Sequence, residues 1–398
     1  MIFQPIQCSG KRTLALRKIC VVVGSRANYS SIKSAMRAIA AHPELELQVV
    51  AVASALLDRY GEVVKLLEKD GFTPAARVFM LVEGETPATM AKSTGLGLIE
   101  LPTVFEQLRP DIVLTVGDRF ETMATALAAA YMNIPLAHTM GGEVSGTIDE
   151  SIRHAITKFA HIHFPACSDA RDRIIKLGER PEDVYLVGCP RMDLVAEVLA
   201  RDTNGLDESV FAEGVGGRFD LAKPFVLLSQ HPVTTEYGQG ERQITETLMA
   251  IKDVGLPCIV LWPNADAGAE DIARGIRKYR ERYGDTGMHF FKNLPAETYI
   301  RLLRRTACLV GNSSSGIREG AFIGTPVVNI GSRQDMRQRG RNVIDVPYER
   351  EAIAAAIEQQ LAQGPYPSEP IYGDGHAGER IAEILAHCSW RLQKRITY

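Results

Sequence analysis

Short apolar runs alternate with helix-length amphipathic segments along almost the whole chain, and this alternation constrains the fold more than any other feature. Apolar runs of this kind, bounded by turn residues, are typical of strands buried on both faces of a parallel sheet. Strands that alternate with helices predict doubly wound α/β units with right-handed crossovers. The expected strands are Ile19–Gly24, Leu47–Ala53, Asp111–Val116, Pro135–His138, Ile162–Pro165, Val184–Val187, Phe225–Ser229, Pro257–Trp262, Met288–Phe291, Ala307–Val310 and Pro326–Ile330. The expected helices begin near Ser30 and at Asp149, and span Leu56–Lys69, Ala88–Leu108, Glu121–Met132 and Ala377–Leu392.

The chain has 398 residues, a length that favours two domains over one. The pattern becomes irregular and glycine-rich between Pro190 and Lys223, and restarts at Phe225. We therefore expect a first domain over residues 1–200 and a second over residues 201–375. A turn-rich connector, Gln363–Gly375, precedes a last helix in residues 376–398.

Charge and composition narrow the class of protein. A formal net charge of -3 disfavours binding of nucleic acid, and the apolar runs are shorter than the ~20 residues of a membrane helix. The first 18 residues lack the apolar core of a signal peptide. Seven cysteines without a CxxC pair indicate reduced core residues, so we expect a cytoplasmic protein. His154, His161 and His163 have no accompanying cysteine pair, so we expect no metal.

A polar cluster follows the expected strands in the middle of the first half. Asp118 and Arg119 come directly after Asp111–Val116, and His138 and Glu143 lie at the end of the next strand. Ligands of parallel sheets bind beyond the carboxyl ends of the strands. Carboxylates, a guanidinium and an imidazole gathered there indicate acid–base chemistry on an anionic ligand. The simpler alternative is a helix N-cap at Asp118 and a structural glycine turn before Glu143.

Asp149 and Arg153 open the next expected helix, four residues apart. An ordinary ion pair on the helix surface is one interpretation. The other is an acid–base carboxylate that faces a cleft and is held by the arginine.

The first strand ends in Gly24-Ser25-Arg26, which lacks the second and third glycines of the dinucleotide fingerprint. Binding of NAD is therefore disfavoured. Arg26 would lie beside a helix N-terminus and is a candidate anion ligand, with a plain surface arginine as the alternative.

The second half carries the clearest phosphate signal, Gly311–Glu319. Small residues at the start of a helix let backbone N–H groups approach an anion, so Ser313 and Ser314 are candidate phosphate ligands unless they merely cap the helix. Glu319 could accept hydrogen bonds from a ribose diol. His231, after Phe225–Ser229, could donate to a phosphate or relay a proton unless its role is structural. Arg333 follows Pro326–Ile330 in a basic cluster with Arg337, Arg339 and Arg341 that is otherwise typical of solvated surface.

These motifs together resemble the hydrolysing UDP-N-acetylglucosamine 2-epimerases of sialic- and legionaminic-acid-type biosynthesis, from about Arg17 to the last helix. The resemblance rests on the segments Gly24–Tyr29, Gly117–Phe120, Gly141–Ala155, His231–Thr235, Asn312–Glu319 and Gly324–Asn329. It implies the GT-B fold, in which two Rossmann-like domains hold the ligand in the cleft between them and the last helix crosses back to the first domain.

The resemblance also implies the chemistry. UDP leaves as carbon 2 of the sugar loses its proton, a glycal forms, and water then adds to give the manno-configured 2-epimer. The implied acid–base set is Asp118, Glu143 and Asp149, with His231 as a further candidate. The implied UDP-sugar ligands are Arg26, Arg119, His138, Arg153, Asn264, Ser313, Ser314, Glu319 and Arg333. No cofactor is needed, and the family suggests a homodimer or homotetramer.

One position departs from the family pattern. Some members carry a glutamate two residues after the histidine, where this chain has Met140. A thioether transfers no protons, but it would suit a sugar without a 6-hydroxyl. The expected substrate is therefore either UDP-N-acetylglucosamine or UDP-2,4-diacetamido-2,4,6-trideoxyglucose. The alternative functions are a GT-B glycosyltransferase with a UDP-sugar donor and a nucleotide-sugar sensor without turnover.

Overall fold

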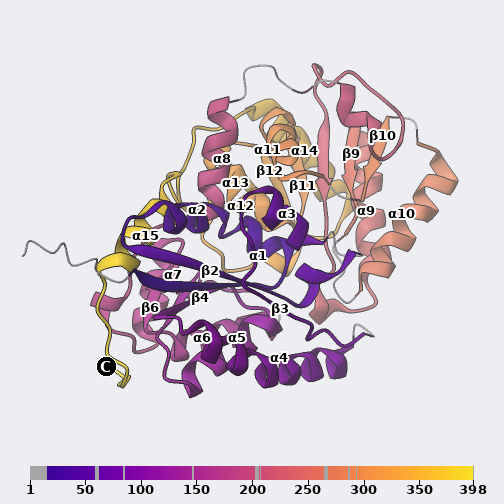
Figure 1. Cartoon of the computed structure of the whole chain (residues 1–398). Coiled ribbons are helices and arrows are strands. Elements are labelled where there is room, and N and C mark those ends of the chain that lie inside the picture. The colour runs from indigo at the N-terminus through magenta and orange to yellow at the C-terminus, as the bar shows by residue number, and fades with distance from the viewer. Residues whose placement is uncertain are drawn as a thin grey trace, which may run out of the picture.

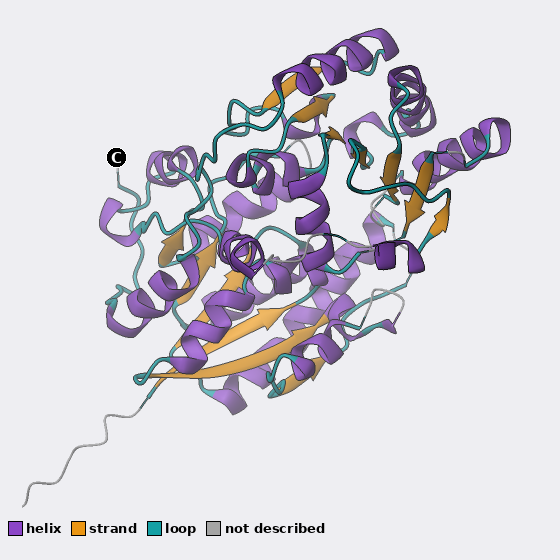
Figure 2. Cartoon of the chain, turned by 90° about the horizontal axis from the view of Figure 1, so that it is seen from above, coloured by secondary structure: helices purple, strands orange, loops and turns teal. Residues whose placement is uncertain are grey.

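The computed structural model describes residues 16–58, 62–83, 86–145, 148–201, 206, 208–263, 268–285, 287–292 and 294–397. Its strands form two separate sheets with helices between and around them (Figures 1 and 2). The predicted α/β class with two Rossmann-like domains is confirmed. The boundaries at residues 200 and 375 stay a proposal.

The first sheet contains six strands in the order β3-β2-β1-β4-β5-β6, all parallel. Side chains alternate between its faces, so Val21 and Val23 pack with one group of helices while Cys20 and Val22 pack with the other. The strands are β1 (Arg17–Val23), β2 (Leu45–Val52), β3 (Ala76–Val78), β4 (Ile112–Val116), β5 (Leu136–Thr139) and β6 (Ile162–Phe164).

Helices cover both faces of this sheet. One face carries α2 (Lys33–Ala41), α3 (Val63–Lys69) and the C-terminal α15 (Ala377–His387). The other carries α4 (Pro87–Leu108), α5 (Phe120–Tyr131) and α6 (Ile148–Phe159). The short elements around them are α1 (Arg26–Ser30), α7 (Ser168–Lys176), η1 (Ala53–Leu56) and η3 (Pro181–Asp183).

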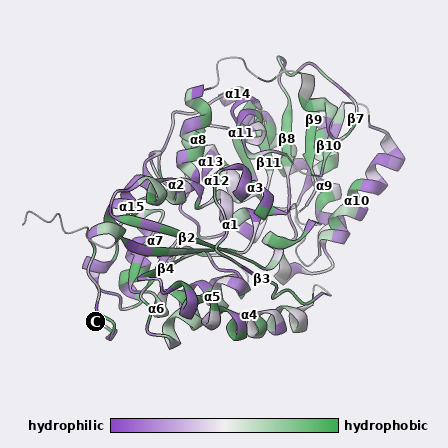
Figure 3. Cartoon of the chain, viewed as in Figure 1, coloured by the Kyte–Doolittle hydropathy of each residue, from purple (hydrophilic) through white to green (hydrophobic). Residues whose placement is uncertain are grey.

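The second sheet has seven strands in the order β13-β12-β11-β8-β9-β10-β7, parallel except for β7. They are β7 (Val215–Gly216), β8 (Val226–Ser229), β9 (Cys258–Leu261), β10 (Met288–Phe291), β11 (Cys308–Gly311), β12 (Val327–Ile330) and β13 (Val343–Val346). Apart from β7, the order from the middle outward repeats that of the first sheet. Figure 3 shows that strands of both sheets are predominantly hydrophobic, as expected of strands covered on both faces.

The helices of this half again lie on two faces. α9 (Gly240–Val254), α10 (Ala269–Tyr283) and α14 (Arg350–Gln363) pack on one face, and α11 (Ala296–Arg305) on the other. Shorter elements follow the ends of β8, β11 and β12, namely η5 (Thr234–Glu236), α12 (Ser314–Ile317), α13 (Glu319–Ile323) and η6 (Ser332–Gln334), and η4 (Glu208–Ala212) precedes β7.

An apolar cluster joins the two halves. It combines Cys167 and Met192 from the first half with Ile300, Ile317 and Tyr372 from the second. α8 (Pro190–Arg201) contributes to this cluster and contacts α2 and α15 as well as α11 and α13. The two halves are therefore held in contact through a buried surface and not only through the chain that connects them.

Some predicted elements differ from the structure. Val184–Val187 is no strand, because only Val184 forms an isolated bridge, to His163. The last helix ends at His387, well before Leu392, since Cys388 adopts an extended backbone. The pattern also missed β3, β7 and β13, which are short or exposed and lack a long apolar run.

None of the helices in the described ranges is both long enough and apolar enough to pass through a membrane.

Candidate active site

Polar side chains follow the ends of β4 and β5 in the first sheet and of β8, β11 and β12 in the second. Glycines with a left-handed backbone turn the chain at several of these ends, including Gly117 (φ 74°) and Gly311 (φ 128°). A Cβ atom at Gly311 would lie 2.2 Å from the carbonyl oxygen of Ser229, so only glycine lets these two strand ends approach each other. The glycines thus bring the polar loops of neighbouring strands together.

Arg153 organises the loops of the first sheet. Its guanidinium, 3% exposed, pairs with the Asp118 carboxylate and donates to the carbonyl oxygen of Glu143 at 2.8 Å and to Ser145 Oγ at 3.2 Å. Burial raises the pKa of the Asp118 carboxyl, but Arg153 and Arg337 outweigh burial and hold this pKa below its ordinary value. Asp118 is therefore an ionised carboxylate at neutral pH, which is the form in which a carboxyl group can accept a proton.

His138 supports the turn that carries Asp118. Its side chain has no exposed surface, and its Nε2 lies 2.7 Å from the carbonyl oxygen of Gly117. Burial lowers the pKa of His138 to about 4, so the imidazole is neutral at pH 7 and its Nε2–H donates to Gly117. In this conformation His138 positions the turn and offers no surface to a ligand.

Glu143 connects the two halves. Its carboxylate pairs with Arg318 and lies 3.9 Å from Arg337 Nη1, while Arg337 Nε donates to the carbonyl oxygen of Val144 at 2.9 Å. Burial raises the pKa of Glu143, but Arg318 and Arg337 outweigh it, so the net shift is downward. The second oxygen, Oε1, is buried and makes no hydrogen bond within the described structure. A polar ligand that enters between the halves can donate to this oxygen.

The two arginines have unequal environments. Burial lowers the pKa of Arg318, but Glu143 outweighs burial and raises it above its ordinary value. Burial and the charge of Arg318 lower the pKa of Arg337 to about 10. Arg337 is thus an incompletely compensated cation, and binding of an anion beside it would be favourable.

Asn312 anchors the strand ends of the second sheet. Its side-chain amide exchanges two hydrogen bonds with the backbone of His231, at 2.7 and 2.8 Å. The main-chain carbonyl oxygen of Asn312 accepts from Arg333 Nη1 at 3.1 Å. Burial, with Arg333 nearby, lowers the pKa of His231 to about 3. The His231 ring is therefore neutral, which suits hydrogen bonding to phosphate better than transfer of a proton near pH 7.

Ser313 and Ser314 start the helical segment after β11. Ser313 is the N-cap of α12, and its Oγ lies 3.4 Å from the Ser315 nitrogen and 2.9 Å from Ser315 Oγ. Both serines are half-buried. The capping interpretation and the phosphate-ligand interpretation are compatible here, because a cap at 3.4 Å is weak and leaves hydroxyl capacity.

Glu319 and Arg26 lie between the two halves, where each contacts the opposite half. Glu319 pairs with Arg191 of α8, whose Nη1 donates to Ser30 Oγ at 2.7 Å. Arg26 Nη2 reaches the carbonyl oxygen of Leu294 at 3.5 Å. Burial and the neighbouring Arg191 lower the pKa of Arg26. A ribose that binds Glu319 must therefore share it with Arg191.

Arg119 and Asp149 lie nearer to solvent. Arg119 Nε donates to Glu121 Oε1 at 3.0 Å and its side chain is 41% exposed. Asp149 is half-buried in the first turn of α6. The predicted ion pair between Asp149 and Arg153 does not form within the described residues, because Arg153 pairs with Asp118 instead. Asn264 lies outside the described residues.

Sequence reasoning missed three arginines that pair with carboxylates between the halves. Arg318 lies inside the quoted motif Asn312–Glu319, and Arg337 belongs to a cluster typical of solvated surface, yet its side chain is only 10% exposed. Arg191 lies in none of the motifs on which the resemblance rests. Its place directly after Pro190, in the irregular stretch between the halves, is the one signal that could have marked it.

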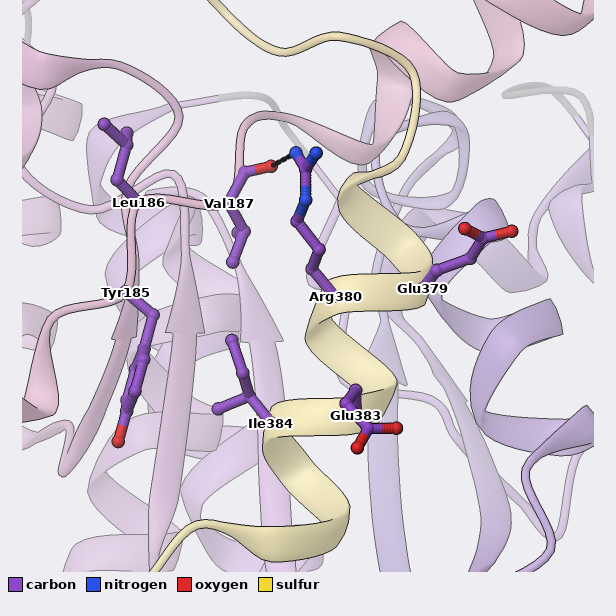
Figure 4. A pocket seen from close by; sticks show the side chains of 7 residues that line it. All are labelled: Tyr185, Leu186, Val187, Glu379, Arg380, Glu383 and Ile384. Carbon is purple, nitrogen blue, oxygen red and sulfur yellow. Dashed lines mark hydrogen bonds between the residues drawn. The ribbon is translucent and has the colours of Figure 1, made fainter.

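The histidines weighed for zinc do not converge. His161 Nδ1 accepts from the backbone N–H of Leu136, His163 faces Glu179, and His154 lies beside Glu150. A cavity of about 520 Å³ does occur beside α15, lined by Tyr185, Leu186, Val187, Glu379, Arg380, Glu383 and Ile384 (Figure 4). It contains none of the predicted site residues.

Several known proteins that are similar to this chain are named as 2-epimerases. The sequence matches the family model described as UDP-N-acetylglucosamine 2-epimerase over residues 37–386. It is 35% identical over 370 residues to the UDP-N,N'-diacetylbacillosamine 2-epimerase (hydrolyzing) of Legionella pneumophila, covering 93% of this chain and 96% of that protein. It is 31% identical over 336 residues to the GDP/UDP-N,N'-diacetylbacillosamine 2-epimerase (hydrolyzing) of Campylobacter jejuni, covering 83% and 85%.

Solved structures share the fold. The UDP-GlcNAc 2-epimerase of Neisseria meningitidis bound to UDP-GlcNAc has a TM-score of 0.76 at 17% identity, over 92% of this chain and 99% of that one. The enzyme of Methanocaldococcus jannaschii in complex with UDP-GlcNAc and UDP gives the same TM-score and identity over the same shares. These likenesses confirm the predicted GT-B arrangement.

Proposed function

Because this chain belongs to the UDP-N-acetylglucosamine 2-epimerase family, we propose that it hydrolyses a UDP-2-acetamido sugar and inverts carbon 2. The observation that carries the proposal is the contact between Glu143, beyond a strand of the first sheet, and Arg318 and Arg337 of the second. Such a contact combines a carboxylate that can face the sugar with cations that can face a leaving diphosphate.

The proposed reaction has two stages. In the first, a base removes the proton from carbon 2 while the bond from carbon 1 to the UDP oxygen breaks, which gives UDP and a glycal. In the second, the hydroxide part of a water molecule adds to carbon 1 and a proton returns to carbon 2 from the opposite face. The sum is UDP-sugar plus water to UDP plus the free manno-configured 2-epimer.

We assign the proton transfers to the first half. Asp118, kept ionised by Arg153, is suited to be the base, and Asp149 is the second acid–base candidate. The unsatisfied Oε1 of Glu143 supports a third role, hydrogen bonding to the sugar or to the attacking water. His231 is neutral, so we assign it to phosphate binding rather than to proton relay.

The diphosphate would lie against the second half. Ser313, Ser314, Arg333 and His231 supply donors there, and Arg337 adds a cation that neighbouring carboxylates compensate incompletely. Positive groups at a departing diphosphate stabilise its developing charge. The remaining proposed UDP-sugar ligands are Arg26, Arg119, Asn264 and Glu319. His138 and Arg153, which were also expected to bind the UDP-sugar, instead hold the turn that carries Asp118.

Met140 bears on the choice of substrate. It has a left-handed backbone (φ 62°) and packs against two apolar clusters, one of which joins the halves. This apolar setting supports a sugar without a 6-hydroxyl, and the Legionella and Campylobacter relatives are named for UDP-N,N'-diacetylbacillosamine, the diacetamido trideoxy sugar. We propose that sugar as the substrate, with UDP-N-acetylglucosamine as the competitor, and nonulosonic acid biosynthesis as the use of the product.

Proton NMR in deuterated water tests the function. Incubation with each UDP-sugar alone should release UDP and the 2-epimer with deuterium at carbon 2, faster for the trideoxy sugar. A clear preference for UDP-N-acetylglucosamine would overturn the substrate assignment. Consumption of UDP-sugar only when an acceptor is added would favour the glycosyltransferase, and binding without consumption would favour a sensor.

Assembly is a separate proposal. We propose a homodimer or homotetramer, on the family resemblance, and light scattering of the purified protein would test it.

A further inference from the structure

Two histidines and a carboxylate converge far from the candidate active site. His42 caps the end of α2, while Glu383 and His387 lie one turn apart on α15, so that two segments from opposite ends of the chain meet. A ligand atom from each residue lies within 4.8 Å of the other two. Residues four apart on a helix share one face, which is how paired helical ligands approach a metal.

The separations fit a tetrahedral ion. Glu383 Oε2 lies 3.5 Å from His42 Nε2, and Glu383 Oε1 lies 3.1 Å from His387 Nε2. Bonds of the length found at zinc place neighbouring tetrahedral ligands about 3.3 Å apart. Both distances are close to this value, although they run to different oxygens of Glu383. The carboxylate must therefore turn one oxygen toward both rings, and the rings must move toward each other, to close the site.

A fourth residue lies close enough to orient one ring after a small movement. Glu44 Oε2 lies 3.6 Å from His387 Nδ1, just beyond hydrogen-bond distance, and a slight approach would let the carboxylate accept the Nδ1 proton and leave Nε2 free for a metal. His42 differs, because its Nδ1 accepts from the backbone N–H of Glu44 at 3.2 Å. Ligation through His42 Nε2 puts a proton on Nδ1, so that hydrogen bond must be given up and the ring must turn.

We propose that His42, Glu383 and His387 form a binding site for a divalent transition-metal ion, Zn²⁺ above all, with Glu44 as the orienting carboxylate. Imidazole nitrogen with a single carboxylate suits zinc, whereas magnesium and calcium prefer sites made of oxygen. The site leaves room for water as the fourth ligand, because His387 and Glu383 are 55% and 66% exposed.

The ion would fasten the C-terminal helix. α15 packs against α2 on the first sheet, although the chain reaches it from the second half. Figure 4 shows Ile384 turned toward Tyr185 and Val187, whereas the carboxylate of Glu383 points away from them. A metal that joins Glu383 and His387 to His42 would therefore add a link between α15 and the end of α2.

The same helix offers a matched control. His376 Nδ1 lies 3.4 Å from Glu379 Oε2, and no third metal-ligand side chain is grouped with this pair in the described structure. Zn²⁺ affinity should be measured on the full chain, without a polyhistidine tag, by competition with a chromophoric chelator. Bound metal should be counted by mass spectrometry, and melting temperatures recorded with and without Zn²⁺.

We expect a single Zn²⁺ per chain and a higher melting temperature with Zn²⁺, with no such effect of Mg²⁺. His42→Ala, His387→Ala and Glu383→Gln should each weaken binding at least about tenfold, Glu44→Gln should weaken it about tenfold, and His376→Ala should match the wild type. Wild-type protein that binds no Zn²⁺ at micromolar concentration would overturn the proposal. So would His42 and His387 variants that bind like the wild type, or an equal loss in His376→Ala.

Discussion

At the scale of the residue, one guanidinium sets the charge of the proposed base. Arg153 pairs with Asp118 and binds the backbone of Glu143, so it fixes the position of two loops as well as the protonation of Asp118. The strand-end position of Asp118 was predictable from the apolar run before it. Its partner was not, because a spacing of four residues favoured Asp149 for Arg153, whereas the fold brings in Asp118 from 35 residues away.

Asp118→Asn tests this residue. The amide keeps the shape of the side chain but accepts no proton, so turnover should fall by about 10²-fold or more while UDP binding stays within about threefold. Rates of UDP release and calorimetric UDP affinity give the two values. Turnover near that of the wild type would remove Asp118 from the mechanism.

At the scale of the element, the helix that begins after β11 is short and has a weak cap. α12 spans four residues, and the chain breaks at Arg318 before α13 begins. The sequence predicted a helix after β11 but not its interruption at Arg318, whose side chain pairs with Glu143 across the interface.

Ser313→Ala should weaken UDP binding by about 1–3 kcal/mol if its hydroxyl contacts a buried phosphate. Thr86→Ala is the matched control, since Thr86 caps α4 by the same type of bond in a distant part of the first half. Both variants lose a helix cap, but only Ser313→Ala should change the UDP dissociation constant. Equal UDP affinity in the two variants would contradict the phosphate assignment.

The C-terminal tail after α15 is a second element whose role the sequence did not reveal. Lys394 Nζ lies 2.7 Å from Glu179 Oε2 and also donates to the carbonyl oxygen of Thr157 at 3.2 Å. Burial raises the pKa of Glu179, but hydrogen bonds from His163, Lys158 and Lys394 outweigh it and lower the pKa to about 2.

Because the pKa of Glu179 is lower in the folded protein, its stabilising effect is present above its ordinary pKa of 4.5 and is lost as the pH falls toward about 2. Glu179→Gln should flatten the dependence of the free energy of unfolding on pH in that range, measured by urea unfolding between pH 5 and pH 3. A Glu179→Gln profile as steep as that of the wild type would refute the assignment.

Lys394→Met should lower the free energy of unfolding at pH 7 by about 1–3 kcal/mol, whereas the exposed Lys176→Met should leave it unchanged.

At the scale of the whole molecule, a buried ion pair spans the two halves. Glu143 and Arg318 are 175 residues apart in sequence and both side chains are less than 10% exposed. Periodicity predicted two Rossmann-like units correctly, since it reports each unit's own core. It carried no information on which loops of the two units face each other, so Arg318, Arg337 and Arg191 were missed as a group.

Arg318→Met should lower the free energy of unfolding by about 3–5 kcal/mol, because it leaves Glu143 buried with only the more distant Arg337. The double variant with Glu143→Gln should recover part of this loss. Arg277→Met, which removes an exposed ion pair with Glu270, should cost less than about 1 kcal/mol. Urea unfolding of the four proteins decides the point, and a double variant less stable than Arg318→Met would contradict it.

A crystal structure of this protein with UDP would test the proposed site most directly. We expect the diphosphate against Ser313 and Ser314, near Arg333 and Arg337, with Asp118 and Asp149 facing its terminal phosphate across the space for a sugar. Nucleotide bound elsewhere, for example in the cavity beside α15, or a terminal phosphate remote from both aspartates, would contradict it.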